Sequence, residues 1–383
     1  MIDGYNFWYW NVGVLLVYRL LIKDRKKFLL AACIQFFLVL AVRSTEIGVD
    51  AWYQYPQVYA GASRMSFAEL VQNWSLVRQI ITPTSWGGES GFVTLNWIFG
   101  HLLGLPYRAL IVFLAFLAAF TMYKYLERNS YSPLLGAVTM YICLLSGNAY
   151  LSAIRRSTAM NFILFAYMAM MDKNRLKAAL LILFAMTMHR SAIIIFLFLP
   201  FIDTKITRDL CRKIIVIIFA AGLIAVPVAS RMLPIVLGWF GKASYFYGAS
   251  GWLNSGARLE VKAVAGIVAL LAIYFFLDFR LLNTAENNML CKIFLFVIIF
   301  SPIQRIVPLL GDIYMYFTPS CYLLVENLIV QRKEDVFIKR MMQLTSLIVM
   351  AAVFSTRVEP LRNSYPQPTS GHYRTIWTSS SGR

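Results

Sequence analysis

The stretch CLLSGNAYLSAIRRSTAMNFILFAYMAMM (residues 143–171) places two adjacent arginines between two long apolar runs. A charged side chain near the centre of a bilayer is costly and usually marks a functional site. Two neighbouring guanidiniums also repel each other unless an anion lies between them. Arginine is the side chain best suited to planar, two-pronged binding of phosphate. Arg155 and Arg156 therefore predict a phosphate-bearing ligand in a membrane protein.

The composition indicates the broad class of the protein. Of the 383 residues, 59% are hydrophobic and 14% are charged, and the mean hydropathy is +0.64. Average proteins carry roughly 25% charged residues, and apolar runs of about 20 residues can cross a bilayer. We therefore expect an all-α polytopic integral membrane protein. The opening MIDGYNFWYWNVG lacks a basic segment, so the first apolar run is expected to remain as a span.

The charge and the cysteines argue against other classes. The net charge is +18, but no basic stretch lies outside the membrane pattern, so we expect no nucleic-acid partner. Much of the positive charge is explained by basic cytoplasmic loops. The five cysteines lie in or beside apolar runs without CxxC or paired spacing. We interpret them as packing thiols rather than metal ligands or disulfides.

Twelve apolar runs alternate with connections that predict a topology. The basic connections are expected to face the cytoplasm. Cytoplasmic and outer connections then alternate along the chain only if segment 91–104 does not cross the membrane. This short, glycine-punctuated segment is expected to be a re-entrant or interfacial helix. The expected spans are approximately 7–22, 28–43, 107–123, 131–148, 157–171, 176–188, 190–202, 213–230, 261–279, 289–304, 313–330 and 340–356.

This topology gives one transmembrane domain over residues 1–356, with both chain ends outside the cytoplasm. Two long outer loops, 44–90 and 231–260, contain many aromatic residues and are expected to lie at the interface and cover a site. Residues 357–383 are expected to form a polar periplasmic tail.

On this topology, lysine and arginine are distributed differently between the two sides of the membrane. Eleven of the 13 lysines face the cytoplasm, whereas many arginines fall at outer ends of spans or in outer loops. The positive-inside rule disfavours cations there, so the excess of arginine needs its own cause. One interpretation is pairing with lipid headgroups or outer acids. The other, which we favour for the set, is a pocket for an anionic ligand. The arginines at outer span ends are Arg43, Arg155, Arg156, Arg190, Arg305 and Arg357.

Two motifs carry candidate carboxylates. Asp50 and Tyr53 follow Arg43 and share a face if the chain is helical there. Asp50 is then either a helix cap or a sugar-binding or general-base carboxylate, and Arg43 is a phosphate ligand. Glu89 lies in Gly87–Phe92, directly before the short helix. It either stabilises the start of that helix or acts at a site.

His189 and Arg190 lie between two apolar runs, at the outer side where Arg155 and Arg156 also emerge. A lone histidine is often structural. Cationic neighbours would, however, lower its pKa and leave a neutral imidazole able to accept a proton. Further along, Arg305 is a candidate anion ligand, and Tyr316 is an aromatic belt residue or a platform for a sugar.

Several catalytic signatures do not occur in the sequence. There is no Walker loop, GxSxG, HExxH or DxD motif, so we expect no metal and no other cofactor. The energy and the leaving group would then have to arrive with a substrate already at the outer face.

The motifs together resemble the EpsG/Wzy-type polysaccharide polymerases. That family has patterns that read approximately R…GxDxxxY, EPGF, RQxxA and FHxSA, in this order. The matching segments are Arg43…Gly48-Val49-Asp50…Tyr53, Glu89-Ser90-Gly91-Phe92, Ile154-Arg155-Arg156…Ala159 and His189-Arg190-Ser191. The sequence departs from the family pattern at Ala51, Ser90, Arg156 and Met188.

The resemblance implies a GT-C-like glycosyltransferase of the bacterial inner membrane that builds O-antigen, capsule or exopolysaccharide. The donor would be a growing chain on undecaprenyl pyrophosphate, and the acceptor a repeat unit on the same carrier. Membrane lipid and a chain-length regulator protein are further expected partners. The expected base is His189, Asp50 or Glu89. The expected pyrophosphate ligands are Arg43, Arg155, Arg156 and Arg305, with Arg190, Tyr53 and Tyr316 as further substrate-binding residues.

Three other functions stay open from the sequence. A flippase or transporter of lipid-linked oligosaccharide also needs a cationic cavity, but it would distribute charge through the depth of the membrane. An O-antigen ligase shares the fold and the donor but transfers the glycan to a lipid A core sugar. A membrane acyltransferase is also histidine-dependent, but it leaves the paired arginine without a purpose.

Overall fold

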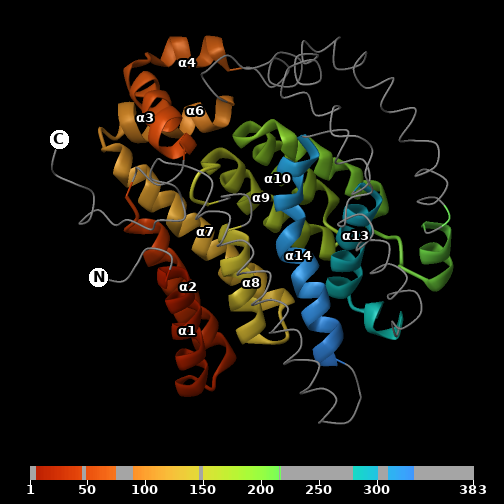
Figure 1. Cartoon of the computed structure of the whole chain (residues 1–383). Helices are drawn as coiled ribbons and strands as arrows, with labels where there is room; N and C mark the ends of the chain where they lie inside the picture. The colour runs from red at the N-terminus through yellow and green to blue at the C-terminus, as the bar shows by residue number, and fades with distance from the viewer. Residues whose placement is uncertain are drawn as a thin grey trace, which may run out of the picture.

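The computed structural model describes residues 6–44, 49–74, 89–145, 150–214, 216, 279–300 and 309–331. Every labelled element in those ranges is a helix, which confirms the expected all-α class (Figure 1). The long helices are α1 (Asn6–Leu21), α2 (Arg25–Ala41), α3 (Val49–Arg64), α7 (Tyr107–Asn129), α8 (Pro133–Leu145), α9 (Ile154–Met171), α10 (Arg175–Met188), α13 (Ala285–Phe300) and α14 (Leu309–Gln331). The shorter ones are α4 (Phe67–Asn73), α6 (Ser90–Trp97), η1 (Ile98–Leu102), η3 (Arg190–Phe201) and η6 (Phe279–Asn283).

Polar caps set the start of several helices. Asp24 precedes α2 and accepts a hydrogen bond of 2.8 Å from the backbone N–H three residues on. Asn174 does the same at the start of α10, at 2.9 Å. Ser66 and Glu69 form a reciprocal capping box at α4. Each cap satisfies a backbone donor that the first helical turn leaves unpaired, so the apolar runs become helical at these points.

The helices are apolar on their exposed faces as well as their buried faces. In α2, Leu30, Ile34 and Leu38 recur every four residues and are each about 50% exposed, although the opposite face is buried. Similar exposed stripes of large apolar residues lie on α7 (Val112, Phe113, Phe116, Phe120) and α10 (Leu176, Leu180, Leu183, Phe184). Long exposed apolar stripes are typical of surfaces that contact lipid. They indicate a membrane-associated protein.

The number of spans is not confirmed. Within the described residues, two helices are long and apolar enough to cross a membrane by length and composition, Tyr107–Asn129 and Ile313–Gln331. Shorter apolar helices cover Tyr9–Leu21, Pro133–Leu144 and Arg190–Phe201. Nearly all of the expected spans 213–230 and 261–279, all of 340–356, the loop 231–260 and the tail 357–383 lie outside the described residues. The expected total of twelve spans therefore stays a prediction.

Ion pairs connect neighbouring ends of α2, α7, α9 and α13 on one side of the molecule. Lys26 at the start of α2 pairs with Glu127 at the end of α7, at 3.4 Å. Arg128, also at the end of α7, pairs with Asp172 after α9 at 2.8 Å and with Glu286 at the start of α13 at 3.2 Å. These contacts place three basic connections side by side, namely 23–27, 123–130 and 172–177. We call this side of the molecule the lysine end.

The opposite side of the molecule is formed by α3, α4 and α6, which lie beyond the ends of α2 and α7 (Figure 1). Arg43, which follows α2, donates a hydrogen bond to the Leu151 carbonyl just before α9. Arg108 at the start of α7 donates to the carbonyl of Arg43. We call this side the arginine end. The expected loop 44–90 contains two helices there, α3 and α4, and the expected short helix over 91–104 is present as α6 and η1.

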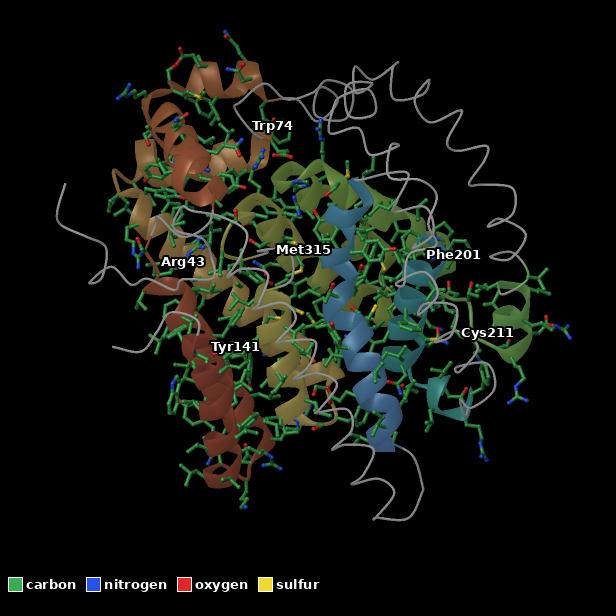
Figure 2. All side chains as sticks on the ribbon, viewed as in Figure 1. Arg43, Trp74, Tyr141, Phe201, Cys211 and Met315 are labelled. Atoms are coloured by element: carbon green, nitrogen blue, oxygen red, sulfur yellow. The ribbon has the colours of Figure 1, made fainter. Side chains whose placement is uncertain are left out.

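Large aromatic side chains fill the space between the long helices (Figure 2). Tyr125, Tyr141, Tyr167 and Tyr316 are all fully buried. The hydroxyl of Tyr125 lies 2.7 Å from Ser320 Oγ and so connects α7 to α14. Because a buried hydroxyl is stabilised by such a partner, this bond helps to fix how α7 meets α14.

Candidate functional site

The paired arginines lie in the first turn of α9. The helix begins at Ile154, and its cap residue, Ala153, provides no side-chain hydrogen bond. The N-terminus of a helix carries a partial positive charge and unpaired N–H groups, so cations there are unfavourable and anions are favoured. Arg155 and Arg156 add two more positive charges at this point. The local field therefore favours a negatively charged group between α9 and its neighbours.

Glu89 supplies one negative charge to this field. Its side chain is only 3% exposed, and its Oε2 accepts a hydrogen bond of 2.8 Å from a terminal nitrogen of Arg155. The backbone N–H of Arg190 points to the other carboxylate oxygen at 3.4 Å. The Arg155 guanidinium also lies 5.7 Å from the centre of the Tyr55 ring. Glu89 thus connects α6 to α9 and to the start of η3.

A glycine allows α6 to approach α10 closely. A Cβ on Gly91 would overlap the side chain of Thr187 and would lie 2.9 Å from the Thr187 carbonyl oxygen. Thr187 belongs to the last turn of α10, two residues before His189. The missing side chain at Gly91 therefore lets the start of α6, with Glu89, pack against the break between α10 and η3.

His189 lies in that break, with extended backbone between the two helices. Its Nδ1 accepts a hydrogen bond from the Ser191 backbone N–H at 3.3 Å, and Ser191 Oγ lies 2.7 Å from the same nitrogen. Ser191 Oγ in turn lies 2.8 Å from the hydroxyl of Tyr316 on α14. A chain of polar contacts thus runs from His189 to the interior face of α14.

The surroundings of His189 keep its imidazole neutral. Burial, aided by the guanidiniums of Arg156, Arg155 and Arg190, lowers the pKa of His189 from 6.5 to about 4, although Glu89 acts in the opposite direction. The charged neighbours of His189 include these three guanidiniums and the Glu89 carboxylate. Several guanidiniums at one helix start favour an anionic ligand beside them.

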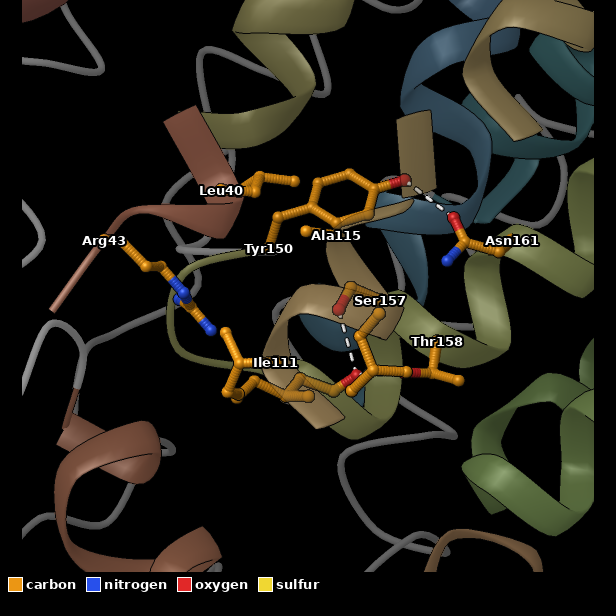
Figure 3. A pocket seen from close by; sticks show the side chains of 10 residues that line it. Leu40, Arg43, Ile111, Ala115, Tyr150, Ser157, Thr158 and Asn161 are labelled. Atoms are coloured by element: carbon orange, nitrogen blue, oxygen red, sulfur yellow. Dashed lines mark hydrogen bonds between the residues drawn. The ribbon is translucent and has the colours of Figure 1, made fainter. Parts of the chain in front are cut away.

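Arg43, which follows α2, lies against a face of α9 different from that of the paired arginines. It is 4% exposed, donates to the Leu151 carbonyl and lines a small cavity of about 20 Å³ (Figure 3). From α9 the cavity is lined by one helix face, Ile154, Ser157, Thr158 and Asn161, and its lining does not include Arg155 or Arg156. This volume holds about one water molecule. A phosphate role for Arg43 stays a prediction.

The structure thus brings several predicted site residues together and leaves others apart. Glu89, Arg155, Arg156, His189 and Arg190 form one group, which we call the cationic site, and Tyr316 reaches it through Ser191. Asp50 and Tyr53 are on α3, but their side chains lie outside the described residues, as does all of Arg305. In the described part of the chain, no three His, Cys, Asp or Glu side chains cluster as metal ligands.

Three residues at the arginine end were not singled out from the sequence. Tyr55 lies under the Arg155 guanidinium, and Ser191 binds the imidazole of His189. Arg108 donates to the carbonyls of Ala41 and Arg43, where α2 ends. Tyr55 follows the candidate Tyr53 by two residues, and Ser191 belongs to the same motif as His189. Both could therefore have been predicted from the sequence. No motif around Arg108 indicates its contacts in the sequence, because they depend on how α2 and α7 pack.

The model of the EpsG family matches residues 26–365, which is most of the chain. The chain belongs to the EpsG family. Comparison with curated proteins and with solved structures found no match. The EpsG match includes every segment of the cationic site. Membership of the EpsG family supports a role in polysaccharide biosynthesis and association with a membrane, consistent with the exposed apolar stripes.

Proposed function

We propose that this EpsG-family protein joins undecaprenyl-pyrophosphate-linked oligosaccharide repeat units into O-antigen, capsular or exopolysaccharide. The observation that carries the proposal is the cationic site. Its guanidiniums gather at the start of α9, where the helix N-terminus also favours an anion. The pyrophosphate of a lipid-linked glycan is such an anion, and the apolar stripes suit a protein whose substrates carry a polyprenyl chain.

The reaction would be a glycosyl transfer between two lipid-linked substrates. A hydroxyl oxygen of the acceptor repeat unit forms a bond to the anomeric carbon of the donor sugar. The bond between that carbon and the phosphate oxygen breaks, and undecaprenyl pyrophosphate leaves with the electron pair. Glu89, His189 or Asp50 takes the proton of the attacking hydroxyl. The guanidiniums of Arg156 and Arg190, with that of Arg155, stabilise the charge that develops on the leaving pyrophosphate.

The proposed location is the inner membrane of a bacterium, with the cationic site facing the periplasm. The described lysine pairs, such as Lys26–Glu127 and Lys124–Glu127, lie at the end opposite this site. Since lysine-rich connections tend to face the cytoplasm, this separation supports a periplasmic site. A chain-length regulator protein would be a further partner in the membrane.

Deletion of the gene, followed by gel electrophoresis of the surface glycan, tests the proposal. We expect long chains to disappear while single repeat units remain attached to their final acceptor. Loss of all attached glycan would instead indicate a ligase or a flippase. Unchanged long chains would overturn the proposed role in polymerisation.

Variants of the cationic site test the site itself. Removing one donor that stabilises developing negative charge costs about 100-fold in rate, so we expect Arg156→Ala and Arg190→Ala to slow chain extension by that order. The purified protein in lipid nanodiscs, supplied with lipid-linked repeat units, gives the rate. Arg212→Ala is the matched control, because Arg212 is exposed and pairs with Asp209, outside the cationic site. Equal rates in all three variants would contradict the assignment of the site.

A further inference from the structure

The hydrogen bonds at His189 define which of its nitrogens carries a proton. A backbone N–H can only donate, and the N–H of Ser191 points at Nδ1 of the imidazole at 3.3 Å. Nδ1 is therefore an acceptor without a proton. A neutral imidazole with a bare Nδ1 carries its proton on Nε2. His189 is thus a donor at Nε2, which lies on the edge of the ring away from Ser191.

Two hydroxyls reinforce this arrangement. Ser191 Oγ lies 2.7 Å from Nδ1 and 2.8 Å from the hydroxyl of Tyr316, which is fully buried on α14. With Nδ1 as the acceptor, Ser191 donates to the imidazole and Tyr316 donates to Ser191. Donors that point in one direction along such a chain strengthen each other. The chain therefore favours the Nε2–H form beyond what a single bond would achieve.

We propose that Tyr316 and Ser191 hold His189 as its Nε2–H tautomer, so that His189 donates a hydrogen bond to a phosphate oxygen of the substrate instead of acting as the base. This inference rests on the proposed function and adds a division of roles to it. Glu89 is then the described carboxylate that takes the proton of the attacking hydroxyl. Ser191 and Tyr316 are positioning residues, because they act through His189.

The charges that face His189 fit a neutral donor. Arg155 and Arg156 come from α9, Arg190 from η3 and Glu89 from the start of α6. Protonation of the imidazole would add a fourth cation to three guanidiniums. Accordingly, burial and these guanidiniums lower the pKa of His189 to about 4. A neutral Nε2–H adds a hydrogen bond for the phosphate without that repulsion.

Nitrogen NMR of the full-length protein in nanodiscs measures the tautomer directly. The chain has three histidines, so the double variant His101→Gln/His372→Gln leaves His189 as the only one. With ¹⁵N-histidine, we expect a protonated Nε2 and an unprotonated Nδ1 at pH 7, with no change down to pH 5.5. A protonated Nδ1, or titration near pH 6.5, would overturn the proposal. Both results are read without any activity.

Activity of matched variants gives the second measurement. A glutamine at position 189 offers an amide N–H near the position of Nε2 but cannot act as a base. We expect His189→Gln to stay within about tenfold of wild type, whereas His189→Ala loses about 100-fold, the cost of a lost donor to developing charge. Ser191→Thr should retain the rate better than Ser191→Ala because it keeps the hydroxyl. Equal losses in His189→Gln and His189→Ala would contradict the donor role.

The two proposals fail in different ways. If the protein does not polymerise lipid-linked repeat units, the wild-type chain shows no extension, whereas the NMR spectrum still reports the Nε2–H form. If polymerisation occurs but His189 is the base, the NMR spectrum shows a protonated Nδ1 and His189→Gln is inactive. Tyr316→Phe adds a further distinction. It should raise the fraction of the Nδ1–H form in the spectrum, and an unchanged spectrum would remove Tyr316 from the chain.

Discussion

Glu89 and Arg155 form an ion pair whose two side chains are 3% and 19% exposed. At this depth, each charge depends on the other, because neither can be solvated fully by water. Removing one partner of a buried pair leaves an uncompensated charge, whereas replacing both is often tolerated. A loss of activity on removing Arg155 would therefore combine lost stability with lost ligand binding.

The first prediction concerns this pair. Arg155→Ala should destabilise the protein by about 3–5 kcal/mol, because the Glu89 carboxylate remains buried without its partner. The double variant Glu89→Gln/Arg155→Ala should recover part of that loss, although both variants lose activity. Thermal unfolding in detergent compares the two. A double variant that melts no higher than Arg155→Ala would show that the pair does not stabilise the fold.

The second prediction concerns pH. His189 has a pKa of about 4 in the folded protein, because of burial and nearby guanidiniums, against about 6.5 in an unfolded chain. Between these values the unfolded chain binds the proton more strongly. The stabilising contribution of neutral His189 is therefore complete above pH 6.5, and the free energy of unfolding decreases as the pH falls towards 4. The wild-type melting temperature should therefore fall between pH 7 and pH 4.5. In His189→Gln the fall should be smaller, and an equal fall would contradict the low pKa of His189.

At the scale of elements, the site depends on short segments that join the long helices. Glu89 precedes α6, the paired arginines begin α9, and His189 separates α10 from η3. Each of these residues lies at a helix end, where backbone N–H groups are available and the chain can turn. The close packing of α6 on α10 through Gly91 brings the three ends together.

The third prediction tests that packing. Gly91→Ala should push α6 away from the last turn of α10, because the new Cβ would meet both the side chain and the carbonyl of Thr187. Overpacking of this kind costs about 1–3 kcal/mol, and we expect at least a tenfold loss of chain extension. Gly61→Ala on α3 is the control, since no atom lies within 4 Å of the added Cβ. Similar behaviour of the two variants would argue against a role for close helix packing.

At the scale of the whole molecule, the two ends differ in chemistry. The lysine end is held by ion pairs between Arg128, Asp172 and Glu286, which tie α7, α9 and α13. The arginine end contains the cationic site and the covering helices α3, α4 and α6 (Figure 1). Long helices with polar chemistry separated at their two ends suit a protein that acts at one face of a membrane.

The fourth prediction tests which end faces which compartment. In spheroplasts, a membrane-impermeant maleimide should label Arg64→Cys, at the end of α3, but label Lys177→Cys only after permeabilisation. Both side chains are exposed, so access is governed by the membrane. Background should be low because the native cysteines are buried or part-buried (Cys33, Cys143, Cys211, Cys291, Cys321). The reverse pattern would place the cationic site in the cytoplasm.

The sequence by itself determined the all-α class and most helix positions in the described ranges, and it singled out the charged residues that the fold brings together. These follow from apolar runs of span length, from polar caps and from charges that are costly beside such runs. Only the tertiary structure decided which charges meet. It paired Arg155 with Glu89, placed Arg43 against another face of α9 and bound His189 through Ser191 to Tyr316. The physical reason is that hydrogen bonds and ion pairs act over a few ångströms, so partners 66 or 125 residues apart are chosen by helix packing and not by local pattern.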